Sequence, residues 1–141
     1  MGLVELSSAL WRERDLLEAL RCTLEEQRLL VAAGRSQRLD RSAGEVESVL
    51  TELRRTELLR AMEADAAAAQ LNLAPNPSLG ALAAAAGEPW EAVLSEHRRA
   101  LLEATAAIST LAEGNRALLE SGYRAASAAL LTDAGSAPAG G

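Results

Sequence analysis

The sequence of 141 residues has no phenylalanine, no lysine, one cysteine and only three aromatic residues. Alanine and leucine dominate, so the core must be aliphatic and narrow, as it is between closely packed helices, and sheets are disfavoured. The single cysteine, Cys22, excludes an intramolecular disulfide, and we expect it to be a plain helix residue, because a reactive thiol needs special surroundings. The length predicts about one domain.

Positive charge is also scarce, since 14 basic residues, all arginine, stand against 20 acidic ones and leave a formal net charge of −6. The arginines are interleaved with Glu and Asp, so we expect no basic patch and neither nucleic acid nor an anionic membrane as a partner. No uninterrupted apolar run approaches the ~20 residues that a membrane span needs. The N-terminus is acidic and polar within five residues, so we expect no membrane insertion and a cytoplasmic location.

Groups that could carry catalysis are few. His97 is the only histidine, and no second ligand or nucleophile stands near it in the sequence, so we expect a structural role for it. The sequence contains no glycine-rich phosphate loop, no Cys-x-x-Cys and no His-x-x-x-His spacing. We therefore predict no catalytic residue, no metal site and no cofactor, and a protein that is not an enzyme.

Apolar residues recur every three or four positions over residues 2–33, which predicts a first long helix. The repeat consists of Leu3, Leu6, Leu10, Leu17, Leu20, Leu24 and Val31. Glu13 and Gln27 interrupt it. Gly34 suits the end of this helix, since glycine adopts the left-handed conformation at little cost, and Ser36 offers a side-chain oxygen to cap the next helix. So short a link predicts an antiparallel hairpin.

A second long helix is expected over residues 37–70. The residues that it should direct toward its partner are Leu39, Val46, Val49, Leu50, Leu53, Leu59 and Met62. The adjacent leucines at positions 58 and 59 allow either of two neighbouring faces. Two prolines in residues 72–77 end this helix with a loop. A short helix over residues 78–86 follows, with Ser78 at the capping position and Gly87 at its end.

Pro89 suits the first turn of a third long helix over residues 89–131. Along it runs a seam with a period of three and four, and its members are Trp90, Leu94, His97, Leu101, Ala104, Ile108, Leu111, Asn115, Leu118, Gly122, Ala125 and Ala129. Residues 132–141 form a Gly, Ala, Ser and Pro tail that should be disordered. The sequence thus predicts an all-α fold: an elongated antiparallel bundle of three long helices with coiled-coil packing, plus one short helix between the second and the third.

The seam changes character at Asn115. Beyond it the seam residues shrink, and a second stripe appears one position over, formed by Leu119, Tyr123, Ala126 and Leu130. The Asn115 amide either fixes the register against a partner helix or lies at a wet edge of the bundle. The two stripes are either buried by the first two helices together or left as a groove or overhang for an amphipathic helix from another protein.

Three runs of the sequence carry a family resemblance: EALRCTLEEQRLLVAAG (18–34), EVESVLTELRRTELLR (45–60) and LAEGNRALL (111–119). The first two are similar to the N-terminal hairpin of FlgN-type flagellar export chaperones. The third resembles the third-helix pattern of that family, an Asn followed after two residues by leucines. The proline-containing loop and Trp90 resemble the alanine- and arginine-rich versions from actinobacteria. The resemblance covers residues 3–131.

The resemblance implies a cytoplasmic chaperone that binds the flagellar hook-filament junction proteins and delivers them to the type III export apparatus. Client binding is attributed to the C-terminal part of this family. Carried over to this sequence, the attribution indicates Asn115, Leu118, Leu119, Tyr123 and Leu130 as partner-binding residues. The residues also allow a structural coiled coil that self-associates through the third helix. A secreted helical-hairpin substrate of a specialised secretion system is a further alternative, although the Trp-x-Gly turn expected there is missing. The oligomeric state of the free chain stays open.

Overall fold

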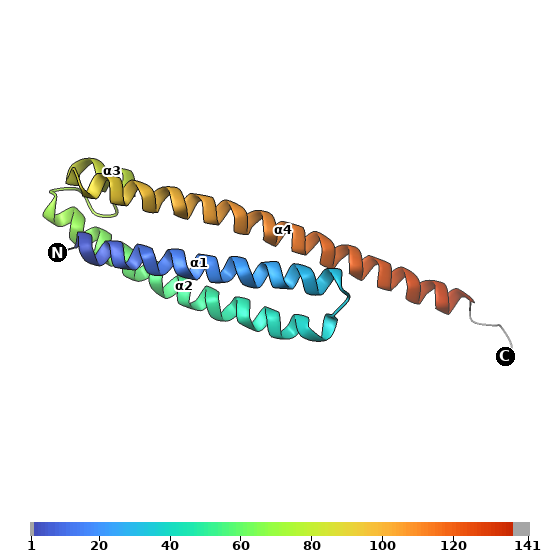
Figure 1. Cartoon of the computed structure of the whole chain (residues 1–141). Helices are drawn as coiled ribbons and strands as arrows, with labels where there is room; N and C mark the ends of the chain where they lie inside the picture. The colour runs from blue at the N-terminus through green and yellow to red at the C-terminus, as the bar shows by residue number, and fades with distance from the viewer. Residues whose placement is uncertain (1, 137–141) are drawn as a thin grey trace.

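The computed structural model describes residues 2–136, which fold into three long helices and one short helix. They are α1 (Leu3–Ala32), α2 (Ser36–Gln70), α3 (Leu79–Ala86) and α4 (Trp90–Ser136). Figure 1 shows α1 and α2 as an antiparallel hairpin, α3 beyond the end of α2, and α4 running alongside α1 in the same direction. The described residues form no strand, and the predicted all-α fold with a short helix between the second and third long helices is confirmed.

The turn between α1 and α2 closes on Gly34, as the sequence predicts. Gly34 has a φ of 67°, in the left-handed region. Its N–H donates to the carbonyl of Val31 at 3.1 Å, and the N–H of Arg35 donates to the carbonyl of Leu30 at 2.9 Å, the two bonds of a Schellman motif. The predicted cap needs correction, because α2 begins one residue earlier, at Ser36 itself. Arg35 holds the N-cap position and makes no capping hydrogen bond with its side chain, since a guanidinium has no acceptor.

At the other end of the hairpin, the loop and α3 turn the chain back so that α4 can start beside the beginning of α1. Asn72 ends α2 in the left-handed conformation, with a φ of 57°. The backbone N–H of Asn76 donates to the Asp65 carboxylate at 2.6 Å, which ties the proline-containing loop to α2. The Ser78 hydroxyl accepts a backbone N–H at 3.0 Å and caps α3 as predicted, and Gly87 follows the helix with a φ of 68°.

Helix α4 extends further than the sequence predicts. It begins at Trp90, directly after Pro89, and continues to Ser136, so residues 132–136 of the tail that was predicted to be disordered are helical. The remainder of that tail, residues 137–141, lies outside the described residues. The extension has a local reason: alanine and leucine are good helix formers, and no proline interrupts the chain between positions 90 and 136.

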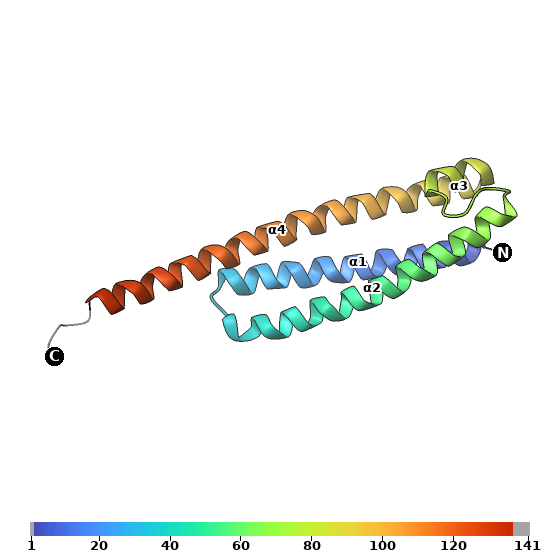
Figure 2. The same cartoon turned by 180° about the vertical axis from the view of Figure 1, so that it is seen from behind.

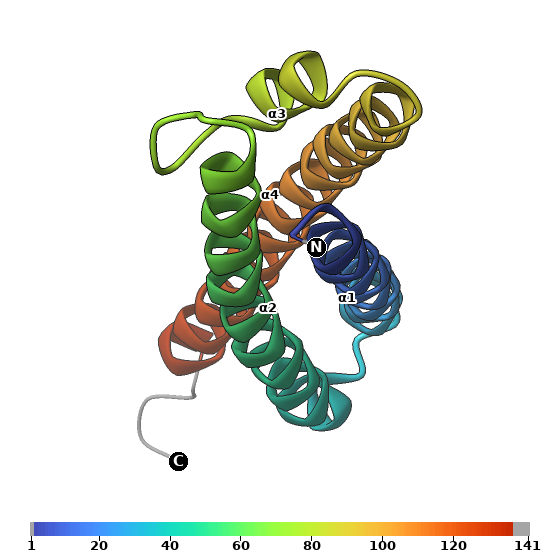
Figure 3. The same ribbon diagram turned by 90° about the vertical axis from the view of Figure 1, so that its left-hand side faces the viewer.

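Two apolar clusters hold the helices together. The first, at the end of the bundle where all four helices meet, consists of Leu6, Leu10, Ala64, Ala67, Ala68, Leu82, Ala83, Leu94 and Leu101. The second lies toward the hairpin turn and consists of Leu16, Leu20, Leu24 and Leu53, with Ile108 and Leu111 among the partly buried residues packed on it. α1 supplies leucines to both clusters and packs against both α2 and α4, whereas α2 and α4 approach each other far less closely. Figure 3 looks along the bundle and shows α4 inclined to the hairpin.

One expectation for α2 is wrong, because Leu59 and Met62 do not face a partner and are 46% and 68% exposed. The contact face of α2 continues instead through the buried Thr56 and through Arg60. The Arg60 guanidinium lies 3.2 Å from the buried carboxylate of Glu13, the first polar interruption in α1. Burial raises the pKa of Glu13, and the charge of Arg60 opposes that rise. The sequence predicted aliphatic contacts at this position along the α1–α2 interface, and the structure places the Glu13–Arg60 pair there instead.

His97 is a buried polar residue of the contact between α1 and α4, with only 1% of its surface exposed. Arg14 Nη1 lies 3.2 Å from Nδ1 of His97, and Ser7 Oγ lies 3.1 Å from Nε2. Because a guanidinium can only donate, Nδ1 is the acceptor and the neutral ring carries its proton on Nε2, which donates to Ser7. Trp11 packs edge-on against the ring at 5.0 Å between centroids. Burial and the Arg14 charge lower the pKa of His97, so the imidazole serves the fold in its neutral form.

The close approach of α1 to the alanine-rich end of α2 gives a stability prediction. Gly2 has a φ of 73°, and a Cβ on it would lie 3.0 Å from the backbone nitrogen of Ala67. We expect Gly2→Ala to lower the free energy of unfolding by about 1–2 kcal/mol. The matched control is Gly44→Ala, where a Cβ meets nothing within 4 Å and the helix interior should gain about 0.5–1 kcal/mol. Chemical denaturation of both variants measures the two effects, and equal shifts of the same sign would contradict the role of Gly2.

The neutral His97 gives a pH prediction. Its pKa in the folded chain lies below that in the unfolded chain, so on acidification through about pH 6.5 the unfolded chain takes up a proton that the folded chain does not. Stability contributed by the neutral ring is therefore present above that pH and is lost as the pH falls, by at most about 1.4 kcal/mol per pH unit. Denaturation curves between about pH 7.5 and pH 5 test this. The control His97→Gln can still accept and donate hydrogen bonds, and it should remove this part of the slope; an unchanged slope would contradict the assignment.

Candidate partner-binding surface

The five residues that the sequence indicates as partner-binding fall into two environments. Leu118, Leu119, Tyr123 and Leu130 are exposed, with 39%, 41%, 75% and 70% of their surfaces accessible. Asn115 is 2% exposed and therefore buried. The seam of α4 is thus part of the core up to Asn115, and beyond that residue the large apolar side chains of α4 are left uncovered by the described part of the chain.

Asn115 is committed to its own fold. Its side-chain nitrogen donates to the backbone carbonyl of Leu24 at 2.9 Å and to the side-chain oxygen of Gln27 at 3.1 Å, both on α1. Gln27, the second polar interruption of the first helix, thereby gains its partner. Of the two interpretations of the amide, fixing the register against a neighbouring helix fits these contacts, and the wet edge does not. Asn115 could contact a partner only by leaving α1, so it positions the exposed residues that follow it.

A groove lies beside the exposed residues of α4, at the turn of the hairpin. On one side it is lined by Leu118, Leu119 and Tyr123 of α4 and on the other by apolar residues near the turn, and its volume is about 430 Å³. The hairpin contributes Leu30, Val31 and Leu39. The sequence pattern assigned Val31 and Leu39 to the packing between the first two helices and did not single out Leu30, whereas all three are half-buried and line this groove. A periodic apolar pattern cannot show at which level a neighbouring helix ends.

Beyond the groove, α4 continues past the turn of the hairpin, as Figures 1 and 2 show from opposite sides. From Asn115 to Ser136, α4 is ~32 Å long at 1.5 Å per residue, whereas α1 runs only ~12 Å from Leu24 to its end at Ala32. Leu130 and its neighbour Leu131 lie on this overhang and are 70% and 74% exposed. The two stripes are therefore not buried by α1 and α2, which was one of the two alternatives.

Other groups with chemical potential do not assemble into a site. Cys22 is an exposed free thiol on α1. The residues that the structure describes contain no cluster of three or more His, Cys, Asp or Glu side chains arranged for a metal ion. Nor does any helix among residues 2–136 combine the length and the apolar character needed to cross a membrane. The apolar surface at the turn of the hairpin is thus the strongest candidate for function.

Comparison with known proteins agrees with this geometry. A family model described as "FlgN protein" matches residues 1–131, which include all of the hairpin, α3 and most of α4. Comparisons with curated proteins and with solved structures give no match. The FlgN family consists of chaperones of flagellar assembly rather than enzymes. Because the model matches nearly the whole chain, this protein belongs to the FlgN family of flagellar export chaperones.

Proposed function

We propose that this chain is a cytoplasmic export chaperone for the hook-filament junction proteins of the flagellum. Its client surface consists of Leu118, Leu119, Tyr123 and Leu130 of α4, together with Leu30, Val31 and Leu39 of the hairpin. The observation that carries the proposal is a groove lined by exposed apolar side chains of α4 and half-buried ones of the hairpin, located where the chain's own packing ends. Exposed apolar surface of this extent is typical of interaction sites.

The shape of this client surface suits an amphipathic helix. The groove is bounded by α4 on one side and by the ends of α1 and α2 on the other, so a helix laid into it would pack as a further member of the bundle. Leu118 and Leu119 line the groove, and Tyr123 supplies a large ring of the kind that anchors interfaces. A terminal helix of a junction protein, covered in this way, would be unable to assemble with other subunits before export.

Substitution of the client surface tests the proposal. Leu119→Asp combined with Tyr123→Asp places two charges in the groove, so we expect the affinity for the terminal helical segment of a hook-filament junction protein to fall about 30-fold or more. Isothermal titration calorimetry with the full chain measures the dissociation constant. Retention of full affinity would contradict the placement of the client surface.

The matched control carries the same charges on exposed leucines elsewhere. Leu58→Asp combined with Leu102→Asp alters residues that are 69% and 56% exposed and that line no part of the groove, so client affinity should stay unchanged.

Light scattering on the free chain tests the alternative of a structural coiled coil that self-associates. A mass of about 15 kDa that does not vary with concentration favours the chaperone, and growth of the mass with concentration favours self-association.

Amide hydrogen exchange gives an independent prediction. Without tertiary cover, the amides of α4 beyond Asn115 should open readily in the free chain. On addition of the client segment we expect new protection there and in the hairpin near Leu30 and Leu39, with little change around Leu94 and Leu101 in the first apolar cluster. Protection confined to that cluster would place the client at the opposite end of the bundle and overturn the proposal.

A further inference from the structure

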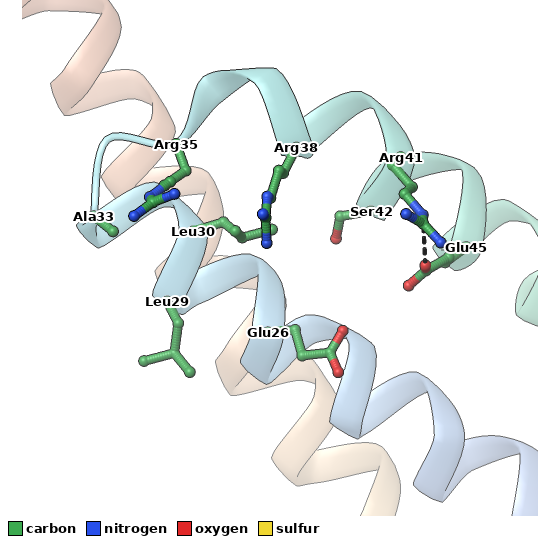
Figure 4. Close-up of a pocket in the computed structure, with 9 residues that line it drawn as sticks. All are labelled: Glu26, Leu29, Leu30, Ala33, Arg35, Arg38, Arg41, Ser42 and Glu45. Carbon is green, nitrogen blue, oxygen red and sulfur yellow. Dashed lines mark ion pairs between the residues drawn. The ribbon is translucent and has the colours of Figure 1, made fainter.

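A second pocket lies at the turn of the hairpin, between α1 and the first turns of α2, and its volume is about 660 Å³. Figure 4 shows Arg38 and Arg41 on α2 and Arg35 directly before it, with Glu26 on α1 across the pocket from them. The three arginines stand three residues apart. The expectation of no basic patch is therefore incorrect at this place, because interleaving along the chain does not prevent arginines from sharing one side of a helix.

The positive charge of this pocket is only partly balanced. Arg41 faces Glu45 at 3.8 Å, a loose and exposed pair, while Arg35 and Arg38 form no ion pair with any described residue. The N-terminus of α2 adds to this charge, since its N-cap residue is Arg35 and its first turn contains no acidic residue. In a chain with a net charge of −6, an uncapped helix end beside two unpaired guanidinium groups is suited to an anion.

Ser42 provides an observation independent of the helix end. It lines the same pocket, is 4% exposed, and its hydroxyl oxygen has no hydrogen-bond partner. Buried hydroxyl groups normally have partners, because leaving one unpaired is unfavourable. Figure 4 shows the hydroxyl directed from α2 toward the side of the pocket formed by Glu26. A ligand that reaches it would supply the missing partner.

The remaining residues of the pocket restrict the chemistry of that ligand. Glu26 and Glu45 line the same pocket and repel a doubly charged group such as phosphate more strongly than a singly charged carboxylate, with which Arg35 and Arg38 can pair. Leu29 lines the pocket from α1 with 70% of its surface exposed and offers an apolar contact at its edge. We propose that this pocket binds a carboxylate side chain presented by an acidic, leucine-containing segment of a partner protein. The site differs from the proposed client surface in its charged residues, although Leu30 and Arg35 line both.

Anisotropy of a fluorescein-labelled peptide of glutamate and leucine residues, measured with the full chain at low ionic strength, tests the proposal. We expect saturable binding, and Arg35→Gln combined with Arg38→Gln should weaken it about tenfold or more. The control Arg54→Gln combined with Arg98→Gln removes the same charge from exposed arginines outside the pocket and should leave affinity nearly unchanged. Absence of binding, or an equal loss in both variants, would overturn the proposal.

Ser42→Ala separates a ligand-binding hydroxyl from a merely structural one. The variant removes an unpaired buried group, so its Tm should rise by a few degrees, while peptide affinity should fall about threefold or more. A higher Tm with unchanged affinity would overturn the assignment of the hydroxyl.

Two further results would overturn the carboxylate specificity. One is that inorganic phosphate competes with the peptide more strongly than acetate does. The other is that the chain binds phosphatidylserine vesicles but does not bind the peptide. The variant that carries both Leu119→Asp and Tyr123→Asp should still bind this peptide. The result of the peptide test is therefore independent of the proposed client surface.

Discussion

The end of the packing between α1 and α4, at Asn115, determines what the rest of the molecule can do. Leucines alone would let two helices shift past each other by one turn at little cost in free energy. The Asn115 amide, however, can donate to the Leu24 carbonyl and to Gln27 in one register only. His97, held between Ser7 and Arg14, fixes the same register further back. With the register fixed, the apolar residues after Asn115 must emerge beside the turn of the hairpin, and the groove follows from that placement.

The second constraint is that α1 and α4 differ in how many neighbouring helices pack against them. α1 is packed on both sides, by α2 and by α4, whereas α4 beyond the first cluster has α1 as its main neighbour and, past the hairpin turn, no neighbour among the described residues. Gly114 and Gly122 weaken helix propensity on either side of the start of the groove, by about 1 kcal/mol each relative to alanine. Helical order in this part of α4 therefore depends more than elsewhere on whatever packs against it.

Local signals made most of the fold predictable from the sequence. Two glycines, Gly34 and Gly87, end helices through their backbone conformation, and the Ser78 hydroxyl caps a helix by accepting a nearby N–H. The seam of the third long helix loses its large residues after Asn115, and this is visible in the sequence itself. The outward position of Leu59 and Met62 was not predictable, because the Glu13–Arg60 pair that takes their place forms only after the hairpin has set its register. The arginines at positions 35, 38 and 41 were visible as a spacing of three, but the buried, unpaired hydroxyl of Ser42 appears only when α1 closes over α2.

The two surfaces at the hairpin turn share a border, and this has a physical consequence. Leu30 and Arg35 line both the apolar groove and the charged pocket. Because Arg35 itself lines the groove, an occupant proposed there would restrict the rotamers of Arg35, and an arginine already ordered in this way would lose less entropy when it binds a carboxylate. The same linkage acts in reverse, since coupling between two binding sites is reciprocal. The two proposed ligands, one apolar and one acidic, would therefore contact common side chains at the turn of the hairpin, and the binding of one would influence the binding of the other.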